Sequence, residues 1–380
     1  MSDGSPKTRT STTLIRASNG LIVNAPPGSG EMVQLGSISE IVSADEDVLE
    51  ALSTYILDHG IVAFPTETVY GLGGLASSSK AILSIFRLKG RPATNPLIVH
   101  LSSLKKVEDV ALLHGSRAEN RMERLASRID PLIPGPLTLV LPARPNSTAP
   151  EVRAGGPTIA IRVPRHPIAQ AFLKRVAVPI AAPSANRSTH ISPTRPRHVL
   201  EEFPDAGIPI LDGGDCQIGL ESTVIDITCD EPTVLRPGFI TQEMLQDVLE
   251  ERVTMAAGHL KNSSTIPFPA RSPGQMSRHY SPRTPLYRPE QLSTLLSRPL
   301  KIGWVCFSAR DAENINLPQD PPALLRILSP QGDINEAAYH LYSTLRELDN
   351  QNLDAIVVDH IPELGVGKAI LDRLGRAQAR

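Results

Sequence analysis

Two cations stand beside a glycine and a proline in the stretch R-L-K-G-R-P-A-T-N-P-L-I-V-H, residues 87–100. A helix with apolar residues at helical spacing is predicted to end there, which places Lys89 and Arg91 at its carboxyl end. The apolar strand that follows ends on His100. Cations in such a place can bind phosphates or carboxylates, but cations are ordinary at helix ends, and the negative end of the helix dipole is the favoured explanation for this stretch alone. This stretch alone therefore does not establish a binding site.

Arg162 interrupts the apolar strand T-I-A-I-R-V-P, residues 158–164. Because side chains alternate along a strand, Arg162 shares one face with Thr158, and the isoleucines lie on the opposite face. Because an isolated buried charge is costly, this arginine must be paired or exposed. It can form an ion pair with Glu67 or Asp226, or it can receive an anionic substrate. The sequence leaves these alternatives open.

Small hydroxyl side chains also gather at predicted strand and helix ends. In α/β folds, ligands bind off the ends of strands, and hydroxyls and cations placed there together suit a ligand rich in phosphate and carboxylate. Any one placement is ordinary, but their number in one domain predicts a shared site. The cations are Lys89, Arg91, Arg162 and Arg236, and the hydroxyls are those of Thr66, Thr68, Ser184, Ser192 and Ser222.

The usual phosphate-binding and metal-binding motifs are missing from the sequence. It contains no GxxxxGKS or GxxxxGKT, and no GxGxxG follows a predicted strand, so neither a P-loop nor a dinucleotide-binding loop is indicated. The histidines form no HExxH and no serine lies in GxSxG. These two absences argue against zinc-dependent hydrolysis and esterase chemistry.

The composition, 41% apolar and 21% charged, is that of a globular protein. A net charge of -2 and an aromatic content of 4% give no general signal for nucleic-acid binding, so anion binding must come from local cations. The three cysteines form no CxxC pair, which argues against a zinc cluster and predicts a reducing, cytoplasmic location. No run approaches the roughly 18 apolar residues of a membrane span, so we expect no membrane anchoring.

Short β-branched runs alternate with amphipathic stretches, which predicts an α/β protein of more than one domain. We expect a mobile N-terminal extension at 1–37, a larger α/β domain at 38–254, a linker or lid at 255–285 and a smaller α/β domain at 286–380. The predicted strands are 61–64, 97–101, 137–141, 158–163, 178–182, 208–211 and 223–227 in the larger domain, and 301–307 and 355–359 in the smaller one. Helices are predicted near 335–348 and at the C-terminus.

Nine ordered motifs together resemble the YrdC-like family of L-threonylcarbamoyladenylate synthases. They are F-P-T-E-T-V-Y-G-L, K-G-R-P-x-x-x-P-L-I-V-H, P-G-P-L-T, R-x-P-x-H, A-P-S-A-N, S-P-T, L-D-G-G, E-S-T-V-I-D and L-R-P-G. The segment S-P-G-Q-M-S-R-H-Y-S-P, residues 272–282, resembles the linker of two-domain members. The resemblance implies a twisted mixed sheet with surrounding helices, followed by a smaller Rossmann-like α/β domain.

That family condenses L-threonine, bicarbonate and ATP into L-threonylcarbamoyladenylate and pyrophosphate, for threonylcarbamoyladenosine modification of ANN-decoding tRNAs. The resemblance implies Mg²⁺ with ATP, a downstream threonylcarbamoyl transferase as partner, an indirect link to tRNA, and a monomer. Matching positions imply that Lys89 and Arg91 are catalytic. By the same match, threonine is held by Thr68, His100, Arg162, Ala182 and Ser222, and ATP by Arg91, Asn95, Thr158, Ser184, Ser192, Arg236 and Tyr280.

The sequence departs from the family pattern at two places. Ile133 stands where many relatives have Trp, which predicts altered packing, and Thr189 stands where Gly is common, in the loop before Ser192. Two other functions compete with the synthase. An RNA-binding module without synthase activity predicts a basic, aromatic face, which the composition does not favour. The carbamoyl-transfer domain of hydrogenase maturation factors comes with zinc-finger modules, for which the CxxC pairs are missing.

Overall fold

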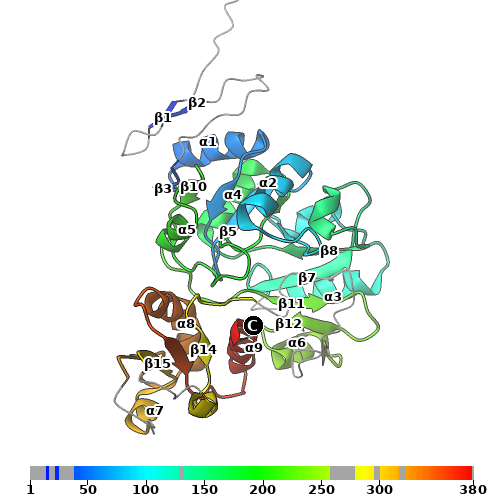
Figure 1. The fold of residues 1–380 in the computed structure, drawn as a ribbon. Coiled ribbons are helices and arrows are strands. Elements are labelled where there is room, and N and C mark those ends of the chain that lie inside the picture. The colour runs from blue at the N-terminus through cyan, green and yellow to red at the C-terminus, as the bar shows by residue number, and fades with distance from the viewer. Residues whose placement is uncertain are drawn as a thin grey trace, which may run out of the picture.

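The computed structural model shows two α/β units packed together (Figure 1). It describes residues 14–16, 22–24, 38–127, 132–256, 279–294, 300–315 and 322–378. Most of the predicted N-terminal extension and linker therefore lies outside the described residues. Within the extension, β1 (Leu14–Arg16) and β2 (Ile22–Asn24) pair antiparallel.

One mixed sheet of eleven strands forms the larger unit, in the order β13-β12-β11-β7-β8-β6-β9-β5-β4-β10-β3. Neighbouring strands are parallel at some positions and antiparallel at others, as the resemblance predicts. The strands are β3 (Glu40–Val42), β4 (Val62–Phe64), β5 (Gly71–Leu75), β6 (Ile98–His100), β7 (Leu137–Pro142), β8 (Thr158–Arg162), β9 (Ile180–Ala181), β10 (Pro209–Leu211), β11 (Thr223–Asp226), β12 (Thr233–Arg236) and β13 (Thr254–Met255).

The helices of the larger unit begin and end at capping residues that the sequence supplies. For α2, the Ser78 hydroxyl accepts a hydrogen bond from the Ala81 N–H at 3.1 Å, and Gly90 ends the helix in the left-handed region at φ 61°. The helix predicted ahead of the cationic stretch is thereby confirmed. The helices are α1 (Glu46–Leu57), α2 (Ser79–Lys89), α3 (Arg117–Ala126), α4 (Pro167–Val176), α5 (Pro196–Glu202) and α6 (Gln242–Leu249), with short 3₁₀ turns at Leu104–Asp109 and Pro150–Arg153.

Strand β5 lies in the interior of the sheet although three of its five residues are glycine. Glycine usually weakens a strand, so the sequence does not predict this element. The neighbours explain it, because a Cβ atom on Gly73 would lie 2.7 Å from the Phe64 ring and 2.9 Å from the Ile180 side chain. Larger side chains on the adjacent strands fill the space that a side chain on β5 would need.

The smaller unit is built on a parallel four-stranded sheet in the order β14-β17-β15-β16, which fits the predicted Rossmann-like unit. Strands β14 and β16 are not predicted from the sequence, since both are short and only partly buried. The elements are β14 (Leu286–Tyr287), a 3₁₀ turn (Pro289–Thr294), β15 (Ile302–Cys306), α7 (Ala309–Glu313), β16 (Leu324–Ile327), α8 (Ile334–Asp349), β17 (Ala355–Val358) and α9 (Gly367–Gln378). No helix among the described residues combines the length and apolarity needed to cross a membrane.

The two units share one apolar core along α8 and α9. Val69, Ile191 and Leu220 of the larger unit pack in the same buried cluster as Leu341 and other side chains of α8 and α9. In Figure 1, α9 lies between the sheet of the smaller unit and the edge formed by α6 and β12. The smaller unit is therefore docked by buried apolar surface.

Gly219 brings the backbones of the two units together. Its φ is +79°, and a Cβ atom there would lie 2.6 Å from the Tyr339 carbonyl oxygen on α8. Gly214 has a similar φ of +67° but open space around it. Alanine substitutions at these two glycines therefore separate the energetic cost of the backbone conformation from the cost of a steric clash at the junction.

We expect Gly219→Ala to destabilise the protein by roughly 3 kcal/mol, because the methyl group forces α8 away from the larger unit. Gly214→Ala, which meets only the left-handed penalty, should cost about 1–2 kcal/mol. Urea denaturation followed by circular dichroism measures both. Equal losses in the two variants would show that α8 does not press on Gly219.

Candidate active site

One cavity gathers most of the residues predicted to bind threonine and ATP. Its volume is about 50 Å³, and it opens where the carboxyl ends of β6 and β8 face the start of β11. The side chains come from the ends of β6, β8 and β12, from beside β9 and β11, from the β4–β5 connection, from Arg91 after α2 and from the segment at 279–280. The lining residues are Thr66, Thr68, Val69, Tyr70, Gly71, Arg91, Ile98, His100, Arg162, Ala182, Pro183, Ser184, Glu221, Ser222, Arg236, His279 and Tyr280.

Arg162 is buried at the end of β8 and is held by three acceptors. Its Nη2 donates to Glu67 Oε1 at 2.8 Å, its Nη1 to the Thr68 hydroxyl at 2.8 Å, and its Nε to the Gly135 carbonyl at 3.2 Å. Of the two partners that the sequence left open, Glu67 is therefore correct and Asp226 is wrong. Asp226 instead accepts from Thr228 at the far end of β11.

Glu67 stays ionised although its side chain is almost fully buried. Burial acts to raise its pKa, but the Arg162 charge and hydrogen bonds from Arg162 and the Arg165 backbone hold the pKa below its usual value. The backbone N–H groups of Arg165 and His166 donate to Oε2 at 3.0 and 3.3 Å. The pair of Glu67 and Arg162 therefore fixes the guanidinium at the mouth of β8.

Three buried cations of the site are held by carbonyl oxygens instead of carboxylates. Lys89 Nζ donates to the carbonyls of Ser184, at 2.6 Å, and Asn186. Arg91 donates to the carbonyls of Asn95, at 3.1 Å, and Pro96, at 2.8 Å. Within the described residues, these contacts orient the two cations without neutralising them. The arrangement suits an anionic ligand.

Arg236 is the third of these cations and is oriented by Ser222. Its Nε and Nη2 donate to the Ser222 carbonyl at 3.1 and 2.9 Å, and Nη2 also reaches the Ser222 hydroxyl at 3.1 Å. That hydroxyl lies 2.8 Å from the Thr138 hydroxyl on β7. Burial lowers the pKa of both Arg236 and Arg91. That of Arg91 falls to about 9, so the Arg91 guanidinium remains charged at neutral pH.

His100 lies in the cavity as a neutral imidazole. Burial, with the Arg162 charge acting in the same direction, lowers its pKa to about 3. Among the described residues, no group accepts from or donates to His100 Nδ1, and the same holds for His279 Nδ1 and the Tyr280 hydroxyl. Buried polar atoms normally have a partner. These three atoms are therefore available to a ligand or to an ordered water.

Four of the predicted residues lie next to the cavity without lining it. Lys89 stands behind Ser184, as described above. Thr158 begins β8, and the parallel register of Ala160 with Ile98 puts it beside the segment that holds Arg91. Asn95 belongs to that segment, and the Ser192 hydroxyl donates to Glu221 at 2.5 Å.

Glu221 is a residue of the site to which the sequence assigns no role. Its buried carboxylate accepts from Ser192 and from two side chains of the smaller unit, Tyr342 Oη at 3.0 Å and Arg373 Nε at 2.8 Å. The E-S-T-V-I-D motif indicated that this segment belongs to the site. Nothing in the local sequence of α8 or α9, however, indicates that Tyr342 and Arg373 contact Glu221.

Tyr280 is held at the cavity in a backbone conformation that is unfavourable for a bulky residue, with φ +63°. The next residue, Ser281, donates its N–H to the Thr189 carbonyl at 2.7 Å, and Thr189 also has a positive φ of +72°. The left-handed conformation explains why Gly is common at the position of Thr189. The other departure, Ile133, is buried in the main core.

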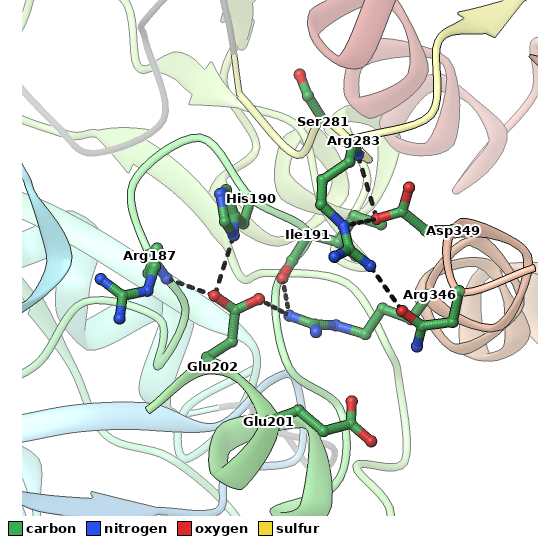
Figure 2. Close-up of a pocket in the computed structure, with 10 residues that line it drawn as sticks. Arg187, His190, Ile191, Glu201, Glu202, Ser281, Arg283, Arg346 and Asp349 are labelled. Atoms are coloured by element: carbon green, nitrogen blue, oxygen red, sulfur yellow. Dashed lines mark hydrogen bonds and ion pairs between the residues drawn. The ribbon is translucent and has the colours of Figure 1, made fainter. Parts of the chain in front are cut away.

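A second cavity of about 240 Å³ lies between α5 and α8 and contains none of the predicted site residues (Figure 2). Its charged groups pair mainly with one another. Glu202 accepts from His190 and from Arg346 of α8, and Asp349 accepts from Arg283. This cavity is part of the junction between the units, and it is not the candidate active site.

His100 should make the stability of the protein depend on pH. The unfolded side chain takes up a proton below its normal pKa of about 6.5, whereas the buried one does so only near pH 3, so stability falls as the pH drops below 6.5. His100→Asn should remove about 2 kcal/mol of the loss between pH 7 and pH 5. Urea denaturation at both pH values tests this, with His114→Asn at an exposed site as control. An unchanged pH dependence in His100→Asn would contradict the burial of a neutral imidazole.

Comparisons with known proteins match each of the two units to a known domain family. A family model described as Telomere recombination, for Sua5, YciO and YrdC proteins, matches residues 54–238, and one described as Threonylcarbamoyl-AMP synthase, C-terminal domain, matches residues 240–379.

Similar curated proteins are named Threonylcarbamoyl-AMP synthase. That of Bacillus subtilis is 35% identical over 90% of this chain and 95% of its own, and that of Pyrococcus abyssi is 37% identical over 85% and 92%. The crystal structure of Pyrococcus abyssi Sua5 complexed with L-threonine matches with a TM-score of 0.75 and 34% identity, over 90% of this chain and 96% of that one. The chain therefore belongs to the threonylcarbamoyl-AMP synthase family, in its two-domain form.

Proposed function

We propose that this enzyme condenses L-threonine, bicarbonate and ATP into L-threonylcarbamoyladenylate and pyrophosphate. The observation that carries the proposal is the convergence of Arg91, Arg162 and Arg236 on one buried cavity. Two anions must meet in this reaction, the threonine carbamate and the α-phosphate of ATP. Cations fixed in a buried site screen their repulsion and stabilise the charge that develops.

Threonine would bind at the end of the cavity formed by β6 and β8. Arg162 offers its guanidinium to the α-carboxylate, and its geometry is already set by Glu67 and Thr68. The neutral His100 and the hydroxyls of Thr68 and Ser222 can hydrogen-bond the amino acid, with Ala182 as the apolar contact. This assignment also supplies a partner for His100 Nδ1.

ATP would bind along the cations held by carbonyl groups. Arg91, Arg236 and Lys89 would contact the phosphates, and the catalytic role of Lys89 and Arg91 would be to stabilise the charge on the transferring group. Lys89 reaches the phosphates only if they replace the carbonyl groups of Ser184 and Asn186 as its hydrogen-bond acceptors. Burial and the Arg91 charge lower the pKa of Lys89. Asn95, Thr158, Ser184 and Ser192 would line the nucleotide side.

The reaction needs positioning, and no protein nucleophile is required. Bicarbonate and the threonine amine form the carbamate with loss of water. A carbamate oxygen then attacks the α-phosphorus, and the bond from that phosphorus to pyrophosphate breaks. Mg²⁺ bound to the phosphates would neutralise part of their charge. Among the described residues, no cluster of three acidic, histidine or cysteine side chains could hold a metal, so the ion would be held by ATP and water.

The segment around Tyr280 would act as a lid over the nucleotide. A cavity of about 50 Å³ is smaller than the several hundred Å³ of a typical ligand site. His279 and Tyr280 line it, so they must move for ATP to enter. The strained φ of Tyr280 is consistent with a residue that changes conformation. The rest of the predicted linker, up to residue 278, lies outside the described residues.

We further propose that the product goes to a downstream threonylcarbamoyl transferase, which links this enzyme indirectly to threonylcarbamoyladenosine formation in ANN-decoding tRNAs. A cytoplasmic location and a monomeric state remain predictions from the sequence and the family resemblance.

The direct test is to incubate the protein with ATP, Mg²⁺, threonine and bicarbonate and to measure pyrophosphate. Threonine-dependent release is the expected result. An RNA-binding module without synthase activity would bind RNA and give no threonine-dependent release.

Arg162→Met should abolish threonine-dependent pyrophosphate release and, by leaving the Glu67 carboxylate unpaired, should cost about 3–5 kcal/mol of stability. Arg162→Met with Glu67→Gln removes the unpaired charge, so it should regain most of the stability but none of the activity. Activity is measured by pyrophosphate release and stability by urea denaturation. Recovery of threonine dependence in the double variant would show that Arg162 serves only the fold.

Tyr280→Ala should leave the fold intact but lower the yield of threonylcarbamoyladenylate per ATP consumed, because carbamates and mixed anhydrides are lost to water in an open site. Chromatography of product and nucleotide together measures the ratio. An unchanged ratio would refute the lid role.

A further inference from the structure

Arg373 of helix α9 makes an unusual set of contacts across the junction. The side chain is buried, with 1% of it exposed, and it comes from the smaller unit. Its Nε donates to Glu221 Oε2 at 2.8 Å, its Nη2 to the Pro237 carbonyl at 2.9 Å, and its guanidinium lies 5.0 Å from the centre of the Tyr280 ring. One side chain therefore touches two separate segments of the larger unit and also the lid.

Two of these contacts lie directly beside proposed binding residues. Glu221 precedes Ser222, and Pro237 follows Arg236. Ser222 and Arg236 are bonded to each other through the Ser222 carbonyl and hydroxyl. Arg373 thus holds both ends of this pair from outside the cavity.

The backbones of these two segments are also packed tightly. A Cβ atom on Gly238 would lie 2.4 Å from the Thr223 nitrogen and 2.7 Å from the Glu221 carbonyl oxygen. A shift in either segment is therefore passed to the other, and the contacts of Arg373 set the position of both.

Charge gives Arg373 a second role. Glu221 lines the cavity, and an unpaired carboxylate there would repel a polyanion. Arg373 supplies the positive charge beside it, and the hydroxyls of Ser192 and Tyr342 complete its hydrogen bonds. Arg373 shares the balancing of Glu221 with Arg236, so part of the Arg236 charge stays available to the ligand.

We propose that Arg373 is a positioning residue for nucleotide binding, through which the C-terminal unit completes the active site. It does not touch the reacting atoms. It orients Ser222 and Arg236, neutralises Glu221 and supports the Tyr280 ring. The proposal rests on the proposed function, since it assigns ATP to the cavity.

Lys368 provides a matched control on the same helix. Its Nζ forms an ion pair with Glu243 Oε1 of α6 at 2.6 Å, so it also bridges the two units, but at the exposed surface and away from the cavity. Lys368→Met removes an ion pair across the junction without touching the site.

The test compares Arg373→Met, Arg373→Lys and Lys368→Met with the wild type at 20 °C, with circular dichroism to confirm folding. Calorimetry gives the affinity for α,β-methylene-ATP, and pyrophosphate release gives kcat and KM for ATP. Arg373→Met should weaken analogue binding at least tenfold and raise KM for ATP. Arg373→Lys, which keeps the charge but cannot reach Glu221, Pro237 and Asp372 together, should lose about threefold. Lys368→Met should stay within twofold.

The proposal is wrong if Arg373→Met binds the analogue within twofold of the wild type, or if Lys368→Met loses as much affinity as Arg373→Met. If Arg373→Met does not fold, the same comparison between Arg373→Lys and Lys368→Met decides. Failure of the proposed function would look different, because the wild type itself would then release no threonine-dependent pyrophosphate.

Discussion

The buried carboxylate of Glu221 is the contact on which both the junction and the active site depend. A carboxylate removed from water is costly unless charged and polar donors surround it. Ser192 comes from the larger unit, and Tyr342 and Arg373 come from the smaller one. Neither unit alone supplies all these donors. The contacts that dock the C-terminal unit are therefore the same contacts that set the charge at this side of the cavity.

The cations of the site fall into two groups, according to whether carboxylates or carbonyl oxygens accept their hydrogen bonds. Arg162 is paired with the carboxylate of Glu67, and Arg373 with those of Glu221 and Asp372, so their geometry is fixed and part of their charge is balanced. Arg91 and Arg236 are held by carbonyl oxygens, which orient them and add no negative charge. Lys89 is held in the same way, but burial and the Arg91 charge lower its pKa. This division explains how a chain with a net charge of -2 provides a strongly cationic cavity.

Much of the fold and most of the site residues were predictable because the signals are local. Caps such as Ser78 and Gly90, and the ends of β6 and β8, follow from neighbouring residues. Two features were not predictable: the contacts of Lys89 with two carbonyl groups, and the strand β5. Each depends on segments that are distant in the sequence. The same holds for Arg373. In the sequence it looks like an ordinary arginine of a helix, and only the docking of α9 shows its contacts. The resemblance to a known family pointed to positions in the larger unit and linker, but not to this one.

The most direct test of this account is a double-mutant cycle between Glu221 and Arg373, read out as affinity for α,β-methylene-ATP. Glu221→Gln, Arg373→Met and the double variant are compared with the wild type. We expect strong coupling: the double variant should bind the analogue at least ten times more tightly than the two single losses, multiplied together, would give. The reason is that no buried carboxylate is left unpaired in the double variant. Losses that simply multiply would contradict it.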